Sequence, residues 1–133
     1  MQKKKKIYEI KHSKIKNAGK GAFATVLIPK KTRIGEYTGE LISSDTFHKR
    51  ENTFYTFEVS KKVGKSYKTF YIDARSSKKS SWLRFVNGAK TKSQQKKVNL
   101  EAYQYKEKIY YRTTKEILPG DEFIIDYGDS YWH

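Results

Sequence analysis

Short runs of β-branched and aromatic residues, separated by turn-forming residues, recur along the whole chain. Val, Ile, Thr, Tyr and Phe fit the pleated, half-buried surface of a strand, so this pattern favours strands over helices. A chain of 133 residues has room for one core, and its eleven Tyr and seven Phe supply much of that core. We therefore predict a mainly β fold, of the β-rich α+β class. The expected strands lie at 7–12 and 22–28, in a glycine-containing pair within 32–43, in a hairpin of 53–59 with 67–74, in a second hairpin of 100–105 with 108–114, and at 122–127.

The stretches between these runs carry distinct turn and cap signals. Two glycines in Asn17-Ala18-Gly19-Lys20-Gly21 predict a tight loop between strands. Leu118-Pro119-Gly120-Asp121 predicts a type II turn, because such a turn needs a positive φ at its third residue. Ser80–Val86 predicts one short helix after a serine-rich cap. Residues 61–66 connect the first hairpin, and residues 90–97 are charged and aperiodic, which predicts an exposed loop.

The residue types also limit the kinds of site that the chain can build. The sequence contains no cysteine, which excludes a disulfide framework and a thiolate zinc site. His12, His48 and His133 are too scattered to form a metal-site pattern, so we expect no metal. No apolar run approaches the roughly 20 residues of a membrane span, and the N-terminus lacks the apolar core of a secretory signal. We expect an intracellular protein with no membrane partner, in which residues 1–7 are a basic tail and residues 8–133 are a single domain.

The formal net charge of +15 points to a polyanionic partner such as nucleic acid, although a lysine-rich solvated surface explains it equally well. Residues 2–6 and 90–97 are the expected contacts with phosphate. The stretch from Glu116 to His133 has the opposite character, because it holds five acids and no Lys or Arg. An acidic end could receive a cationic peptide while the remaining surface faces phosphate. The five acids are Glu116, Asp121, Glu122, Asp126 and Asp129.

Five motifs occur in an order that resembles a SET domain, over roughly residues 8–132. They are Lys20-Gly21-Ala22-Phe23-Ala24-Thr25, Ile34-Gly35-Glu36-Tyr37-Thr38-Gly39-Glu40, Tyr71-Ile72-Asp73-Ala74, Arg84-Phe85-Val86-Asn87 and Glu122-Phe123-Ile124-Ile125-Asp126-Tyr127-Gly128. The chain looks most like a SET domain of the PR type. That likeness lies in Ser81-Trp82-Leu83-Arg84-Phe85-Val86-Asn87, Asn99-Leu100 and Ile109-Tyr110-Tyr111-Arg112-Thr113.

The resemblance implies a SET-domain fold of short sheets with a C-terminal pseudoknot, which places the Asn87 segment beside the final strand. It implies an enzyme that transfers methyl groups from S-adenosylmethionine to lysine side chains of protein. A histone tail is the expected substrate, with nucleosomal DNA as a further contact and a nuclear or chromatin location. Cofactor and peptide would enter from opposite faces.

By matching positions, the resemblance also assigns site residues. The cofactor would be bound by Ala18, Gly19, Lys20, Tyr55, Asn87 and Gly88. Tyr127 and Tyr37 would be catalytic, and Tyr111 and Trp132 would line the substrate channel. Most members carry Asn-His where this chain has Asn87-Gly88, and a cysteine-rich zinc module after the final strand, which this sequence does not contain. Tyr131 and Trp132 would pack over the site in its place.

Lysine methylation makes specific chemical demands that these residue types can meet. A lysine side chain has a pKa of about 10.4, so only about one in a thousand is neutral at neutral pH. An aromatic channel desolvates the ammonium and lowers its pKa, and the nearby sulfonium charge acts in the same direction. Positioning of nitrogen, methyl and sulfur in line supplies much of the remaining acceleration. No conventional base is needed, and we expect Asp73 to be a structural hydrogen-bonding group rather than an acid catalyst.

Two other interpretations stay open at this point. The chain could be a binding module in chromatin that keeps the fold without useful turnover, as Asn87-Gly88 allows. It could also be a nucleic-acid-binding protein in which the positive charge is the primary feature, and this function is compatible with the enzyme.

Overall fold

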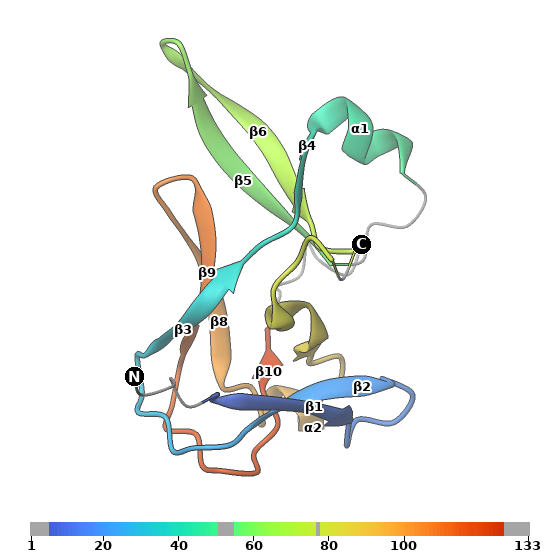
Figure 1. Cartoon of the computed structure of the whole chain (residues 1–133), viewed down its shortest axis with the longest axis vertical. Helices are drawn as coiled ribbons and strands as arrows, with labels where there is room; N and C mark the ends of the chain where they lie inside the picture. The colour runs from blue at the N-terminus through green and yellow to red at the C-terminus, as the bar shows by residue number, and fades with distance from the viewer. Residues whose placement is uncertain (1–5, 51–54, 77, 127–133) are drawn as a thin grey trace. The chain divides into compact units, whose positions relative to one another are not determined.

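The computed structural model describes residues 6–50, 55–76 and 78–126, which form two compact units (Figure 1). The first unit comprises the described residues of 1–34, 85–102 and 112–133, and the second those of 35–84 and 103–111. The prediction of a mainly β chain is confirmed, because short strands make up most of the elements. The prediction of a single domain over 8–133 stays a prediction.

The first unit begins with an antiparallel hairpin. Strands β1 (Tyr8–His12) and β2 (Lys20–Ala24) pair with His12 opposite Lys20. The loop between them turns at Asn17 and Gly19, whose φ angles are 66° and 71°, and the Ser13 N–H donates to the Gly19 carbonyl at 2.8 Å. The predicted glycine loop is therefore confirmed, with β2 starting inside the motif rather than after it.

The end of the described chain is a short parallel strand in the first unit. Strand β10 (Ile124–Ile125) lies between β7 (Asn87–Gly88) and the start of β8 (Leu100–Tyr105), with Ile124 opposite Asn87. This pairing confirms that the Asn87 segment lies beside the final strand. The strand is shorter than the predicted 122–127, because Glu122 and Phe123 bond to β2 instead: the Phe123 N–H donates to the Ala22 carbonyl at 2.8 Å.

The sequence predicts that residues 90–97 are an exposed loop. In the structure they are not a simple loop. They contain one helical turn, α2 (Lys92–Gln95), held by a capping box between Thr91 and Gln94. The capping box satisfies the N-terminal backbone donors, which stabilises a turn that has no apolar face to bury. The type II turn is confirmed: Gly120 has φ 93°, and the Asp121 N–H donates to the Leu118 carbonyl at 3.0 Å.

The second unit contains a three-stranded antiparallel sheet in the order β4 (Glu40–Ser43), β6 (Ser66–Asp73), β5 (Thr56–Val63). Strands β5 and β6 form the predicted hairpin, which closes more tightly than residues 61–66 suggested because Val63 pairs with Ser66. Gly64, with φ 65°, supplies the left-handed residue of the turn.

Residues 32–43 form two strands that do not pair with each other. Strand β3 (Arg33–Tyr37) is at the edge of a five-stranded sheet beside β9 (Lys108–Thr113), whereas β4 pairs with β6. Gly39 stands between the strands, and a side chain there would place Cβ 2.4 Å from the Asp73 carbonyl oxygen. The glycine therefore marks a close backbone approach between segments. The predicted hairpin of β8 and β9 is confirmed, because the two strands are hydrogen-bonded neighbours in the five-stranded sheet.

Two short helices lie wholly or mostly in the second unit. The helix predicted within Ser80–Val86 is a 3-10 turn, η1 (Trp82–Phe85), with Leu83 buried. Helix α1 (Ser44–Lys49) was not predicted, because its six residues show no apolar periodicity. Its N-cap is Ser43, whose side chain accepts from the Thr46 N–H, and the Phe47 ring stacks on Tyr71 at 3.8 Å between centroids.

Each unit has its own buried side chains. In the first unit the largest are Phe23, Phe123, Leu100, Ile117 and Ile125, and in the second they are Tyr37, Tyr111, Leu83 and Val59. Aromatic and β-branched side chains therefore dominate both cores, as the composition predicts.

Candidate functional site

In the first unit, the residues predicted to bind a cofactor gather around one glycine loop. Ala18 is half-buried, and Gly19 and Lys20 are exposed. A side chain at Gly19 would meet nothing within 4 Å, so the loop backbone is open to a ligand on that side. Asn87 and Gly88 are half-buried in β7. We call Ala18, Gly19, Lys20, Asn87 and Gly88 the glycine-loop cluster.

The side-chain amide of Asn87 joins the two segments of this cluster. Its Nδ2 donates to the Lys20 carbonyl at 3.0 Å and to the Glu122 Oε2 at 3.3 Å. The fold thus brings together loop and strand residues that are 67 positions apart in the sequence. The side-chain amide that the sequence motif singles out has a structural task in addition to any contact with a ligand.

Glu122 is a residue of this site that was not predicted from the sequence, where it appeared in the last motif and among the acids of the C-terminal stretch without a role in the site. Its carboxylate is buried, and it accepts from the Ser13 hydroxyl at 2.6 Å and from the Lys14 N–H at 3.0 Å, in addition to Asn87. A buried carboxylate is stable only when hydrogen bonds replace its hydration. A side chain on Gly21 would put Cβ 2.4 Å from Oε2, which explains the glycine at that position.

In the second unit, three aromatic rings pack together, and we call Tyr37, Phe57 and Tyr111 the aromatic cluster. The rings of Tyr37 and Tyr111 stack at 5.6 Å between centroids with 22° between planes. Phe57 meets both edge-on, at 4.7 Å from Tyr37 and 5.8 Å from Tyr111. Such aromatic surfaces attract cations and exclude water. The two tyrosines were predicted as site residues, whereas Phe57 was not; its alternation with Val59 in a strand was the available signal.

Tyr37 and Tyr55 are linked through a hydrogen bond in the second unit. The Tyr37 hydroxyl is buried and donates to the Tyr55 carbonyl at 2.6 Å. Tyr55 itself is exposed and has φ 69°, and the Arg84 guanidinium lies over its ring at 4.6 Å. Tyr55 is therefore held in the second unit by contacts on its backbone and ring, whereas the glycine-loop cluster is in the first.

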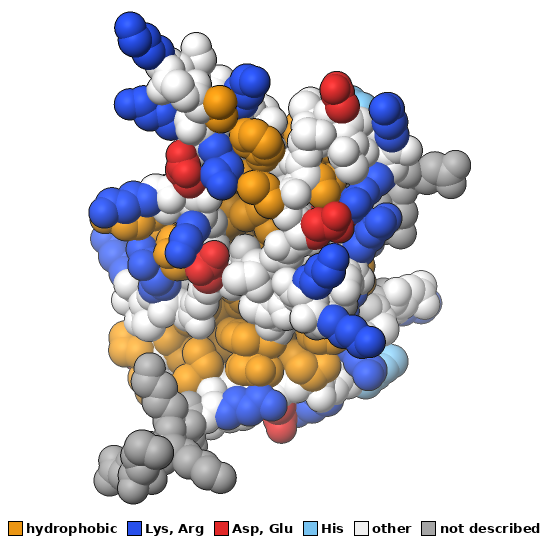
Figure 2. Space-filling model, turned by 45° about the horizontal axis from the view of Figure 1, so that its top comes forward, with side chains coloured by type: hydrophobic (Ala, Val, Ile, Leu, Met, Phe, Trp, Pro, Cys, Tyr) orange, Lys and Arg blue, Asp and Glu red, His pale blue; other side chains and the backbone are white. Residues whose placement is uncertain are grey.

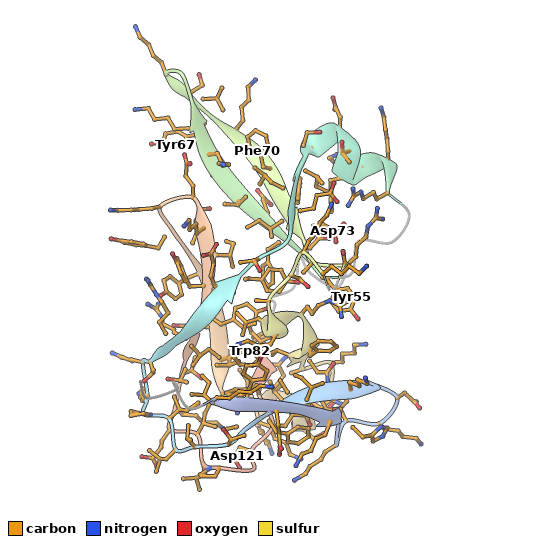
Figure 3. All side chains as sticks on the ribbon, in the orientation of Figure 1. Tyr55, Tyr67, Phe70, Asp73, Trp82 and Asp121 are labelled. Carbon is orange, nitrogen blue, oxygen red and sulfur yellow. The ribbon has the colours of Figure 1, made fainter. Side chains whose placement is uncertain are left out.

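Asp73, at the end of β6 (Figure 3), is the structural group that we expected. It is buried, forms an ion pair with Arg50 at 2.5 Å, and accepts from the Arg75 N–H at 3.0 Å. The pKa of Arg50 is raised, mainly by its hydrogen bond to Asp73, which opposes the effect of desolvation. These contacts occupy the carboxylate and leave it no role as an acid.

Three predicted site residues, Tyr127, Tyr131 and Trp132, lie outside the described residues. Among the residues that the structure does describe, no group of His, Asp and Glu side chains is arranged to hold a metal ion. No helix of the described chain is long and apolar enough to cross a membrane.

Comparison with known proteins gives one consistent result. A family model described as the PR domain of PR domain zinc finger protein 2 matches residues 8–133. The histone-lysine N-methyltransferase set-17 of Caenorhabditis elegans is 34% identical over 125 residues, which are 94% of this chain and 42% of that protein. The chain thus spans less than half the length of this relative.

Two solved structures share the fold. The methyltransferase domain of human PR domain-containing protein 2 superposes with a TM-score of 0.76 at 28% identity, covering 92% of this chain and 77% of that one. ATXR5, in complex with histone H3.1 mono-methylated on R26, has a TM-score of 0.75 at 18% identity, covering 92% and 57%. At the latter identity the likeness concerns the fold alone.

Proposed function

The chain belongs to the PR-domain family of SET-type domains, and on that premise we propose that it transfers methyl groups from S-adenosylmethionine to lysine side chains of protein. The observation that carries the proposal is the hydrogen bond from Asn87 to the Lys20 carbonyl, because it unites the two segments of the glycine-loop cluster. The relatives named as histone-lysine methyltransferases, such as set-17, support the same activity.

The glycine-loop cluster fits S-adenosylmethionine chemically. The cofactor presents a nucleoside and an amino-acid group, both of which are bound well by backbone N–H and carbonyl groups. Gly19 leaves its side of the loop open, and Gly88 offers backbone groups without a side chain. In this proposal Ala18, Gly19, Lys20, Asn87 and Gly88 hold the cofactor, and the cofactor contact of Tyr55, a residue of the second unit, stays a prediction. When bound, the cofactor supplies an electrophilic methyl group on a sulfonium.

The aromatic cluster is suited to the lysine side chain. Buried aromatic walls desolvate an ammonium and lower its pKa, which raises the fraction of the neutral amine that can attack. Aromatic faces in such a channel wall would also attract a cationic lysine or sulfonium. We assign Tyr37 and Tyr111 to the substrate channel and keep Tyr127 as the proposed aligning tyrosine and Trp132 as a proposed channel residue.

We propose a histone tail as the substrate and chromatin as the location. The tail is cationic, and Glu116 and Asp126 in the described C-terminal stretch are exposed to meet it. Glu122 is also an acid of this stretch, but it is buried and is not exposed to a peptide. The relative set-17 is named a histone-lysine N-methyltransferase, which supports a substrate of this kind.

A contact with nucleosomal DNA is a second part of the proposal. Lys and Arg side chains are spread over the visible face of the molecule in Figure 2, with fewer acids between them. The exposed residues 90–97 around α2 are among the candidates, whereas residues 2–5 lie outside the described residues.

Labelled methyl transfer from S-adenosylmethionine to histones and nucleosomes, with mass spectrometry of the products, tests the activity. Tyr127→Phe should abolish transfer while leaving the far-ultraviolet circular dichroism unchanged. Tyr67→Phe is the matched control, since Tyr67 is 71% exposed, and it should keep full activity. Failure of the wild-type chain both to transfer methyl and to bind the cofactor in calorimetry would favour a binding module instead.

A further inference from the structure

The first unit contains a lysine-lined hollow. Within the described part of the chain, none of the residues assigned to the cofactor or to the substrate lysine lines it. The hollow has a volume of about 490 Å³ and lies between the β1–β2 loop, helix α2 with the residues that follow it, and the segment before Ile117. We call it the lysine pocket, after Lys14, Lys16, Lys96, Lys97 and Lys115, which line it.

The five lysines come from three separate segments, so the fold rather than one basic run brings them together. All five are exposed. The Lys115 ammonium donates to the Lys96 carbonyl at 3.2 Å, which ties two of the segments to each other. Among the described residues, none of the five forms an ion pair with a carboxylate.

Two carboxylates also line the pocket, and both accept hydrogen bonds from the protein. Glu122 accepts from Ser13, Lys14 and Asn87. Asp121, labelled in Figure 3, accepts from the Leu118 N–H at 3.0 Å. Five positive charges therefore surround a hollow that holds two negative ones. Their mutual repulsion is relieved when an anion binds, since clustered charges of one sign concentrate counter-ions.

The lining points to phosphate on a duplex rather than to stacked bases. Proteins that bind single strands combine a basic groove with aromatic platforms for the bases. Within the described residues, the lining of the lysine pocket includes Ser93, Gln94 and the lysines but no aromatic side chain. Flexible ammonium groups with small polar neighbours suit backbone oxygens, which carry affinity without sequence preference.

We propose that the lysine pocket binds the phosphate backbone of double-stranded DNA. This inference makes the DNA contact proposed above specific to one site, and it does not depend on methyl transfer. It adds Lys14, Lys16 and Lys115 to the basic residues that the sequence had singled out.

Fluorescence anisotropy with a labelled duplex of mixed sequence, measured across a salt series, tests the proposal. If each of the five lysines meets one phosphate, the slope of log affinity against log salt is about −4.5, and affinity falls about 500-fold between 50 and 200 mM salt. In the triple variant Lys16→Gln, Lys96→Gln, Lys97→Gln the slope should become about −1.8, and the same salt change should cost only about 12-fold.

A matched variant separates the pocket from the overall charge. Lys62→Gln, Lys65→Gln, Lys68→Gln removes the same charge from exposed positions on the β5–β6 hairpin and should leave the slope nearly unchanged. Thermal unfolding checks that both variants are folded, and methyl transfer to a short peptide should be the same in both.

Several results would overturn the inference. Equal slopes in the two triple variants would mean that DNA contacts are spread over the surface, and the general DNA proposal would survive without the pocket. A flat salt response of the wild-type chain would remove both. Displacement of DNA by S-adenosylmethionine would assign the hollow to the cofactor, and stronger binding of a single strand than of the duplex would exclude backbone recognition on duplex DNA.

Discussion

The side-chain amide of Asn87 donates a hydrogen bond to the buried carboxylate of Glu122, 35 positions later in the chain. The same carboxylate binds Ser13 and Lys14 at the start of the glycine loop. One acid therefore joins the two segments that the proposed cofactor site requires. Glu122 acts as a positioning residue, since its oxygens are occupied by the protein itself.

Glu122→Gln should weaken this junction. A glutamine presents an NH₂ group where the carboxylate now accepts, so one donor loses its partner, at a cost of about 1–3 kcal/mol in the free energy of unfolding. We expect urea unfolding to show this loss and the KM for S-adenosylmethionine to rise while the KM for peptide stays constant. Glu101→Gln is the control, because its ion pair with Arg112 is half exposed and should contribute less than about 1 kcal/mol. An equal rise of both KM values would argue against a positioning role.

Gly21→Ala should disturb the same carboxylate from the other side. The new Cβ would lie 2.4 Å from the Glu122 Oε2, so the side chain or the strand must shift. We expect a loss of about 1–3 kcal/mol in thermal unfolding, together with weaker cofactor binding in calorimetry. Gly35→Ala is a milder change, since its nearest contact would be an ordinary 3.5 Å to Leu83. If the two variants behave alike, the clash at Glu122 is not the cause.

The ion pair of Asp73 with Arg50 should stabilise the second unit. Asp73→Asn removes the charge that the Arg50 guanidinium meets, and we expect a loss of about 1–3 kcal/mol, because Asp73 is buried while Arg50 keeps some contact with water. Glu9→Gln breaks an ion pair that is half exposed on both sides, and it should cost less than about 1 kcal/mol. Chemical denaturation compares them, and similar losses would contradict the assignment.

Tyr71 should make stability depend on pH in the alkaline range. Its pKa is raised, first by burial and second by the Glu58 carboxylate. The folded chain therefore holds this proton more tightly than the unfolded chain, so the contribution is complete below the unfolded pKa of about 10 and is lost as pH rises through the folded pKa. Between about pH 8 and about pH 11, Tyr71→Phe should lose less unfolding free energy than the wild type. Tyr67→Phe, at an exposed position, should match the wild type.

Phe57→Leu tests the aromatic cluster. The change removes edge-on contacts with Tyr37 and Tyr111, each of which contributes about 0.5–1.5 kcal/mol beyond the area buried. If these rings form the wall of the lysine channel, methyl transfer to a peptide should slow while cofactor binding is kept. Phe70→Leu, on β6 in the same unit (Figure 3), serves as the control and should leave transfer unchanged. Loss of cofactor binding in Phe57→Leu would contradict the assignment to the substrate side.

Much of the fold could be predicted from short-range signals. The strands of the β5–β6 and β8–β9 hairpins follow from runs of strand-forming residues. Gly120 identifies its turn, because the third residue of a type II turn needs a positive φ, which glycine adopts readily. Helices α1 and α2 were missed, since each is a short segment stabilised by a polar cap rather than by an apolar face. Strands β3 and β4 were predicted to pair with each other, because strand propensity does not indicate which strand is the neighbour of which in a sheet.

The sequence by itself determined the strand-rich class, the turns and the motif residues Gly19, Tyr37 and Asn87, because these depend on local conformation and on the order of residues along the chain. Only the tertiary structure decided that Glu122 is a buried acceptor rather than part of an acidic surface, that Phe57 joins the aromatic cluster, and that five lysines surround one hollow. The physical reason is separation along the chain. The Ser13–Glu122 hydrogen bond spans 109 positions, and a contact of that range is set by how strands pair and cores pack, which no local pattern records.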